Sequence, residues 1–211
     1  MSLKSPIFEE TYKNYLAQVA GIDLSSRAAT LGIRLENEKA LILLFGKPYR
    51  VSPLGVFDPS GQEPDHAVKV ALCKYLLLCP ETEPIGEEWV SYKDFKAAAP
   101  FVGGFINNTE KALVRHFSGS FDRLREAGQS LGGYPADLEV SYQLALRFEA
   151  LPKIPILLLF NDEDEEFPAQ GSLLFQKKAE GYLDMECLAI LGWALTDALL
   201  AAAGIHQPTI M

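Results

Sequence analysis

The clearest alternation of apolar and polar positions runs through residues 139–149. The apolar members of this stretch are Val140, Tyr142, Leu144, Leu146 and Phe148. A period of two predicts a half-buried antiparallel strand. The continuously apolar run 156–160 predicts a strand buried on both faces, and residues 171–175 predict a third strand. Together these segments predict a β meander that is covered by helices.

A second meander is predicted in the N-terminal part of the chain. Residues 33–58 contain short alternating or apolar stretches that are separated by Gly46 and by the turn residues Pro53 and Gly55. Residues 89–92 predict one further, brief strand. Antiparallel meanders combined with helices indicate the α+β fold class.

Apolar residues spaced by three or four predict the helices. They extend over 7–20, 23–31, 65–79, a short segment at 94–99, a stretch from about 108 to 127 with a break at Gly119, and 182–203. The pair Gly103-Gly104 predicts a loop. Several helices are therefore expected to pack on the two meanders.

The last predicted helix, 182–203, is apolar nearly all round, so we expect it to be the central helix of the core. A membrane span is disfavoured because Asp197 interrupts the apolar run and no Lys or Arg flanks it. Glu186, Trp193 and Asp197 mark the stripe of this helix that we expect to meet solvent or a partner.

Composition indicates one ordinary globular domain over residues 1–211, with a loose tail at 203–211. The chain has 48% hydrophobic and 22% charged residues. Its net charge of −9 repels nucleic-acid phosphates and anionic lipids, so neither nucleic acid nor a membrane is an expected partner. The three cysteines and the lack of an apolar signal segment predict a reducing cytoplasm.

The most unusual local feature is a run of five acids, residues 162–166. Alternate side chains of an extended segment point the same way, so Asp162, Asp164 and Glu166 are the candidate ligands for a hard cation. The alternative is a solvated hairpin tip that keeps the apolar strands on either side soluble.

The cysteines do not predict an integral iron–sulfur cluster. Cys73 and Cys79 lie on different faces of a predicted helix, and Cys187 is remote in sequence. Such clusters usually take four closely spaced cysteines. We expect three thiols that act as small hydrophobic side chains.

Candidates for a pocket are His66, Trp89, Tyr92 and Phe167. Asp65-His66 could transfer a proton, although Asp65 equally suits a helix cap. Neither a phosphate-binding loop nor a nucleophile elbow occurs in the sequence. No catalytic residue and no cofactor can therefore be assigned.

Several short motifs resemble one family. They are Gly86-x-x-Trp89-Val90-Ser91-Tyr92, Gly132-Gly133, Pro152-x-Ile154-Pro155, Asp164-x-Glu166-Phe167-Pro168, Leu174-Phe175 and Tyr182-Leu183. The chain resembles functionally uncharacterised proteins of anaerobic bacteria and archaea, some of which carry an iron–sulfur binding label. The resemblance implies no established catalytic residue. Gln176 departs from the acidic residue that the family pattern has after Leu-Phe.

Three functional hypotheses follow. The first is a non-enzymatic domain of anaerobic metabolism that binds a ligand or serves metal or corrinoid proteins. The second is an enzyme with a pocket near Trp89, His66 and the Asp162–Phe167 loop. The third is an interaction module that pairs with another protein or with a second copy through the Trp193 stripe or a strand edge.

Overall fold

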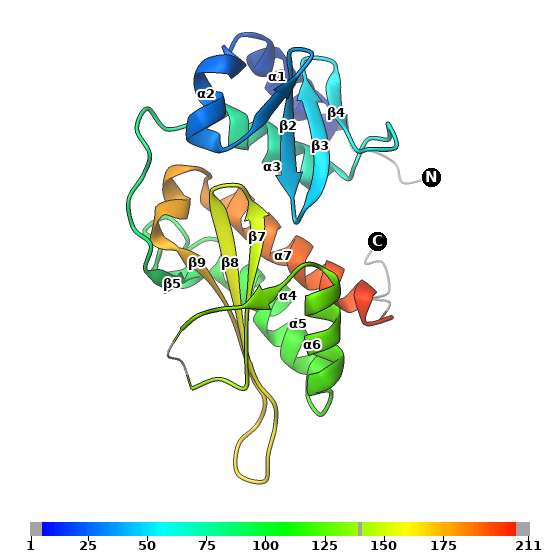
Figure 1. Ribbon diagram of the computed structural model, residues 1–211, viewed down its shortest axis with the longest axis vertical. Coiled ribbons are helices and arrows are strands. Elements are labelled where there is room, and N and C mark those ends of the chain that lie inside the picture. Colours follow the sequence, from blue (N-terminus) through cyan, green and yellow to red (C-terminus); the bar gives the residue numbers. More distant parts are fainter. Residues whose placement is uncertain (1–5, 139–140, 206–211) are drawn as a thin grey trace.

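The N-terminal lobe combines one small sheet with three helices. The computed structural model describes residues 6–138 and 141–205 (Figure 1). The elements of this lobe are α1 (Pro6–Ala20), α2 (Leu24–Leu31), β1 (Arg34–Glu36), β2 (Lys39–Leu44), β3 (Lys47–Ser52), β4 (Gly55–Phe57) and α3 (His66–Leu77). The strands form an antiparallel sheet in the order β1-β2-β3-β4, which confirms the predicted meander.

The C-terminal lobe is built around a larger antiparallel sheet of order β5-β9-β8-β7-β6. Its elements are β5 (Trp89–Ser91), α4 (Val102–Asn108), α5 (Glu110–Phe117), α6 (Phe121–Ser130), β6 (Tyr134–Pro135), β7 (Leu144–Leu151), β8 (Ile154–Asn161), β9 (Gln170–Gln176) and α7 (Met185–Ala202). Short 3₁₀ turns cover Tyr92–Asp94 and Lys177–Gly181. The meander β7-β8-β9 and the α+β class are confirmed.

The apolar pattern of the central strands explains their position. Leu146 faces Leu158 across the β7–β8 ladder, and Leu158 faces Leu173 across the next one. Every residue of β8 except Asn161 is buried, as the continuous apolar run predicts. The alternation is confirmed for residues 144–149, but β7 begins at Leu144, so residues 141–143 lie outside the strand that was predicted to start at 139; residues 139 and 140 lie outside the described part.

Helix α7 is the central helix of the core. It packs against α3, α4, α5 and α6, so it contacts both lobes. Among the described residues it is the one helix long and apolar enough to cross a membrane, but most of it is buried inside the protein. The side chains of Glu186 and Asp197 are exposed and Trp193 is partly exposed, as the polar stripe predicts.

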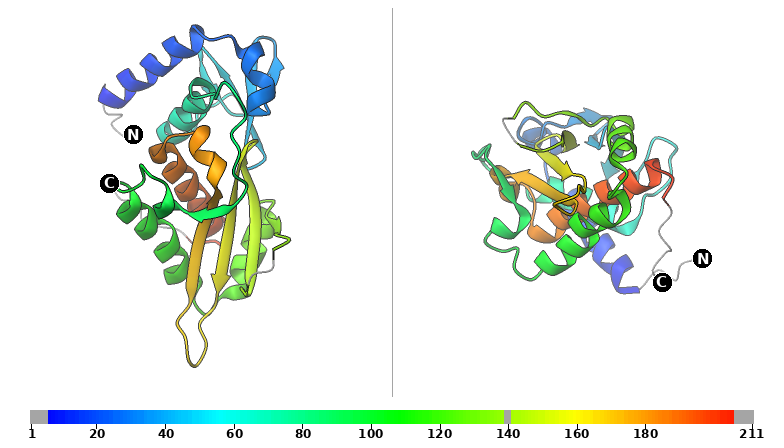
Figure 2. Two further views of the ribbon diagram at one scale, coloured as in Figure 1. Left: turned by 90° about the vertical axis from the view of Figure 1, so that its left-hand side faces the viewer. Right: turned by 90° about the horizontal axis from the view of Figure 1, so that it is seen from below.

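Helices α3, α4, α5 and α7 lie on one side of the two sheets (Figure 2). The chain crosses between the lobes once, through residues 78–88. Buried residues of both lobes form one continuous hydrophobic cluster. That 1–211 is one domain stays a prediction, and residues 206–211 lie outside the described part.

Two predictions between residues 94 and 104 are wrong. Residues 94–99 form a 3₁₀ turn and further turns rather than a helix, and Gly103-Gly104 lies inside α4 rather than in a loop. For α4 the reason is tertiary: Phe105 is fully buried and stacks on Tyr92 with ring centroids 4.2 Å apart. This packing outweighs the low helix propensity of glycine.

The last helix begins three residues later than predicted. Asp184 precedes α7, and its carboxylate accepts a hydrogen bond from the Cys187 backbone N–H at 2.9 Å. An N-cap has non-helical backbone angles, so residues 182–184 cannot belong to the helix.

Candidate functional site

A cleft lies where the smaller sheet meets the β7–β8 turn of the larger one. Its volume is about 450 Å³, and it is lined by Gly32, Arg34, Leu41, Leu43, Gly46, Glu149, Leu151 and Pro152. This volume falls in the range of small-molecule sites, which are usually apolar with a few polar groups. The lining has that composition, with one arginine and one glutamate among apolar residues and glycines.

The tip of the β2–β3 hairpin contributes Gly46 to the cleft lining. Phe45 and Gly46 both have positive φ, 48° and 75°. Two such residues make a turn that normally favours Asn-Gly, and a bulky residue there costs about 1–2 kcal/mol. The Phe45 N–H donates to the Ala150 carbonyl at 3.0 Å, so this strained tip is docked on the other lobe.

A second hollow of about 120 Å³ adjoins the cleft and shares Gly46 and Glu149 with it. Phe45, Leu131 and Phe148 are among its walls. An aromatic residue at the hairpin tip therefore forms part of the site, which gives the unusual backbone conformation of Phe45 a structural role.

Gly32 lets the two lobes approach each other at the cleft. Its φ is +65°, and a Cβ atom there would lie 3.1 Å from Cβ of Pro152. Both the backbone conformation and the contact favour glycine.

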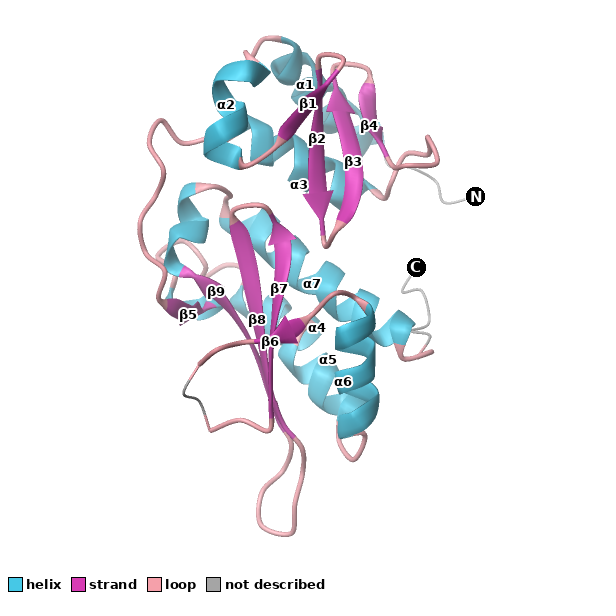
Figure 3. Ribbon diagram, viewed as in Figure 1, coloured by secondary structure: helices cyan, strands magenta, loops and turns pink. Residues whose placement is uncertain are grey.

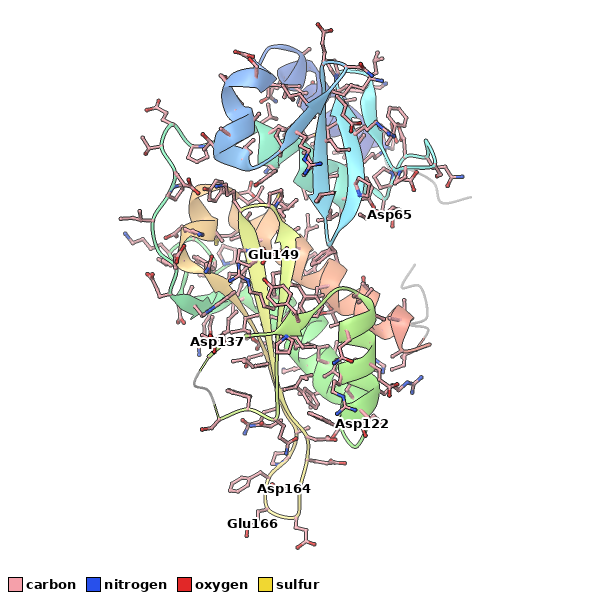
Figure 4. All side chains as sticks on the ribbon, in the orientation of Figure 1. Asp65, Asp122, Asp137, Glu149, Asp164 and Glu166 are labelled. Atoms are coloured by element: carbon pink, nitrogen blue, oxygen red, sulfur yellow. The ribbon has the colours of Figure 1, made fainter. Side chains whose placement is uncertain are left out.

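Glu149 is held from two sides. Its Oε1 accepts the Tyr134 hydroxyl at 2.5 Å and Nε of Arg147 at 2.9 Å. The Arg147 guanidinium lies 5.9 Å from the Trp89 ring centroid. Burial, and then the hydrogen bond to Glu149, raise the pKa of Tyr134. Figure 4 labels Glu149 on the sheet close to the smaller lobe.

Arg34 is the cation of the cleft. It faces Leu41 in the β1–β2 register, and its side chain is exposed at the rim. Within the residues that the structure describes, no hydrogen bond or ion pair holds its guanidinium. Arg50 on the same sheet, by contrast, pairs with Glu36 at 3.7 Å.

The four predicted pocket residues lie in separate environments. Trp89 joins the Arg147–Glu149 group, and His66 stacks on Phe8 at 4.9 Å. Tyr92 is buried and donates its hydroxyl to the Met185 carbonyl, and burial raises its pKa to about 12. Phe167 is 61% exposed on the loop after β8. Asp65, next to His66, and Asp164 are far apart in Figure 4.

The carboxylates of the acidic run bind backbone amides. Asp162 accepts from the N–H groups of Gly119 at 2.7 Å and Phe121 at 3.2 Å. Asp164 accepts from those of Glu166 and Phe167. In the described part of the chain, no three His, Cys, Asp or Glu side chains are grouped so as to hold a metal ion. A cation site at Asp162, Asp164 and Glu166 stays a prediction.

The cysteines are separate free thiols. Cys73 and Cys187 are fully buried, and Cys79 is partly buried. Burial raises the pKa of all three thiols, that of Cys73 to about 12. A neutral buried thiol is unreactive and packs as a small hydrophobic group.

Fold and cleft together define an α+β protein of two antiparallel sheets with a ligand-sized site between them. The chain belongs to the family described as a domain of unknown function, DUF3786, which matches residues 23–198. This match includes every residue of the cleft lining. No curated protein and no solved structure matches the chain.

Proposed function

We propose that this protein is a non-enzymatic ligand-binding domain, and that its inter-sheet cleft binds a small organic molecule with an apolar body and one anionic group. The observation that carries the proposal is the Arg34 guanidinium, which none of the described residues pairs with, at the rim of a largely apolar cleft of about 450 Å³.

The apolar body would lie against Leu41, Leu43, Leu151 and Pro152. Leu43 is 47% exposed although it belongs to strand β2. Covering apolar surface of this kind contributes roughly 25 cal/mol per Å². The cleft therefore supplies affinity without any rearrangement of the buried core.

Arg34 would select the anionic group. A guanidinium binds a carboxylate or phosphate through two parallel hydrogen bonds. Glu149 already accepts from Tyr134 and Arg147, so it is fixed in place on the other wall of the cleft. It would repel a second negative charge and favour a ligand with a single anionic end.

The lining also supports a binding role over a catalytic one. Among the described residues that line the cleft there is no Ser, Thr, Cys, His or Lys. Covalent catalysis needs a nucleophile beside a base, and the one carboxylate of these walls, Glu149, already accepts hydrogen bonds from Tyr134 and Arg147. The family resemblance suggests the setting, an accessory role in the anaerobic cytoplasm.

Titration calorimetry with three chain-matched probes, octanoate, octylamine and octanol, tests the proposal. We expect octanoate to bind at least about tenfold more tightly than the other two, because a charged hydrogen-bonded pair contributes about 1.5–3 kcal/mol. Arg34→Gln should remove this preference. Arg50→Gln is the matched control, because that arginine lies on the same sheet outside the cleft lining and should leave binding unchanged.

Equal binding of the three probes, or unchanged octanoate binding by Arg34→Gln, would contradict the proposed charge selection. Chemical conversion of a bound ligand, followed by mass spectrometry, would replace the binding role with the enzymatic one.

A further inference from the structure

The cleft between the two sheets holds two opposite charges that do not neutralise each other. Arg34 and Glu149 both line it. In the described part of the chain no ion pair joins them, because Glu149 pairs with Arg147 and none of the described residues pairs with Arg34. Arg147 itself is not part of the cleft lining. A ligand in the cleft therefore meets one guanidinium and one carboxylate.

One oxygen of the Glu149 carboxylate is occupied and the other is open. Oε1 accepts both the hydrogen bond from the Tyr134 hydroxyl and the one from Nε of Arg147. Among the described residues, no donor reaches Oε2. The side chain is 45% exposed, so a ligand can approach that oxygen. Two donors thus fix the orientation of a carboxylate that still has acceptor capacity.

The two charged residues are anchored at different levels of strand β2. Arg34 faces Leu41 in the β1–β2 register. Glu149 belongs to the level of the hairpin tip, because the Phe45 N–H donates to the carbonyl of Ala150, the next residue along β7 (Figure 1). Residues 41 and 45 are separated by about 13 Å along an extended strand. The two charges therefore enter the cleft from separate ends.

Apolar side chains occupy the space between these two levels. Leu43 lies midway between residues 41 and 45, and it lines the cleft together with Leu41. Leu151 and Pro152 supply the apolar surface of the other lobe. A molecule that contacts both charges must therefore cross an apolar stretch of the cleft.

We propose that the ligand of the cleft is an ω-amino carboxylate, a molecule with a carboxylate at one end, an ammonium group at the other and an apolar chain between them. This inference rests on the proposed function and adds the second charge to it. The carboxylate accepts two hydrogen bonds from the Arg34 guanidinium, and the ammonium group donates to Oε2 of Glu149. The chain lies on Leu41 and Leu43. An α-amino acid carries both charges at one end, so it leaves one of the two protein groups unused.

Titration calorimetry of the full-length protein with three carboxylates of equal chain length tests this inference. The probes are octanoate, 8-aminooctanoate and 2-aminooctanoate. We expect Glu149→Gln to weaken the binding of 8-aminooctanoate at least about fivefold, because it removes one of the two charged contacts. The same variant should bind octanoate and 2-aminooctanoate at least as tightly as the native protein does. Retained octanoate binding also shows that the cleft of the variant is intact.

Glu165→Gln is the matched control. It removes the same charge from an exposed position on the acidic loop, outside the cleft lining, and should leave the affinity for all three probes unchanged. A comparison on the native protein needs no variant. The probe 8-hydroxyoctanoate keeps the chain and the carboxylate but lacks the ammonium charge, so it should bind at least about threefold more weakly than 8-aminooctanoate.

Undiminished binding of 8-aminooctanoate by Glu149→Gln, an equal loss for 2-aminooctanoate, or equal binding of the amino and hydroxy probes would each overturn the inference. The proposed function would then still stand if octanoate binding depends on Arg34. Octanoate binding that does not depend on Arg34 would instead overturn the proposed function, and a failure of every probe to bind would overturn both.

Discussion

Two hairpins of this protein end in opposite ways. The β2–β3 hairpin ends in Phe45-Gly46 and docks on the other lobe, whereas the β8–β9 hairpin ends in an acidic loop that projects from the body (Figure 3). The first tip is apolar, and its contacts with the other lobe compensate for an unfavourable backbone conformation. The second satisfies its own backbone amides of Glu163, Glu166 and Phe167 with Asp162 and Asp164. The residues of a tip thus determine whether a hairpin joins two lobes or enters water.

Phenylalanine substitutions at the two tips should give the largest contrast. Phe45→Ala removes an aromatic wall between the lobes, so we expect the free energy of unfolding to fall by about 1–3 kcal/mol. Phe167→Ala should change it by no more than about 0.5 kcal/mol, because that side chain is 61% exposed. Urea unfolding followed by circular dichroism measures both.

A further variant separates contact from strain at the docked tip. Asn suits the left-handed backbone but cannot replace the aromatic contacts. We therefore expect Phe45→Asn to be destabilised as well, though less than Phe45→Ala. A variant more stable than the native chain would show that strain outweighs docking.

The contribution of the acidic loop, residues 162–166, to the free energy of unfolding should depend on one carboxylate more than on the total charge of the loop. Asp162→Ala removes three backbone hydrogen bonds, from the amides of Gly119, of Phe121 at the start of α6 and of Glu163, and should lower the free energy of unfolding by about 1 kcal/mol. Glu165→Ala removes the same charge from an exposed position and should have almost no effect. Equal losses from the two variants would assign the effect to charge alone.

The smallest expected effect is a pH dependence at the docked hairpin. Hydrogen bonds from Ser60, Gln62 and Lys47, the residue after the tip, hold the pKa of Asp58 well below its ordinary range. This stabilisation is present above the unfolded-state pKa of about 3.9 and is lost as the pH falls through the lower folded-state value. Asp58→Asn should therefore flatten the decline of the urea midpoint below about pH 4. A decline as steep as in the native chain would exclude Asp58 as its source.

The sequence predicts the regular parts of this fold because their signals are local. Alternation in β7, the apolar run of β8 and the glycine after β2 each identify an element directly. The prediction of a loop at Gly103-Gly104 is wrong because α4 is fixed by a tertiary contact, the stacking of Phe105 on Tyr92. Local propensity carries no information about such a contact.

The cleft was not predicted because its walls come from distant parts of the chain. Gly32 and Arg34 meet Leu151 and Pro152 only when two sheets pack together. A usable signal existed at Phe45-Gly46, an aromatic residue where the turn favours Asn. The polar side of the β7 pattern also contained Arg147 and Glu149, but nothing in that pattern shows that Tyr134 and Trp89 approach them.

The single passage of the chain between the lobes has a spectroscopic consequence. Both tryptophans, Trp89 and Trp193, follow residues 78–88, so the smaller sheet and its helices contain none. Tryptophan emission therefore reports on the C-terminal lobe alone, while far-ultraviolet circular dichroism reports on both. If the two signals change at different urea concentrations, the lobes unfold separately. If the two curves superimpose, the shared core joins the lobes into one cooperative unit.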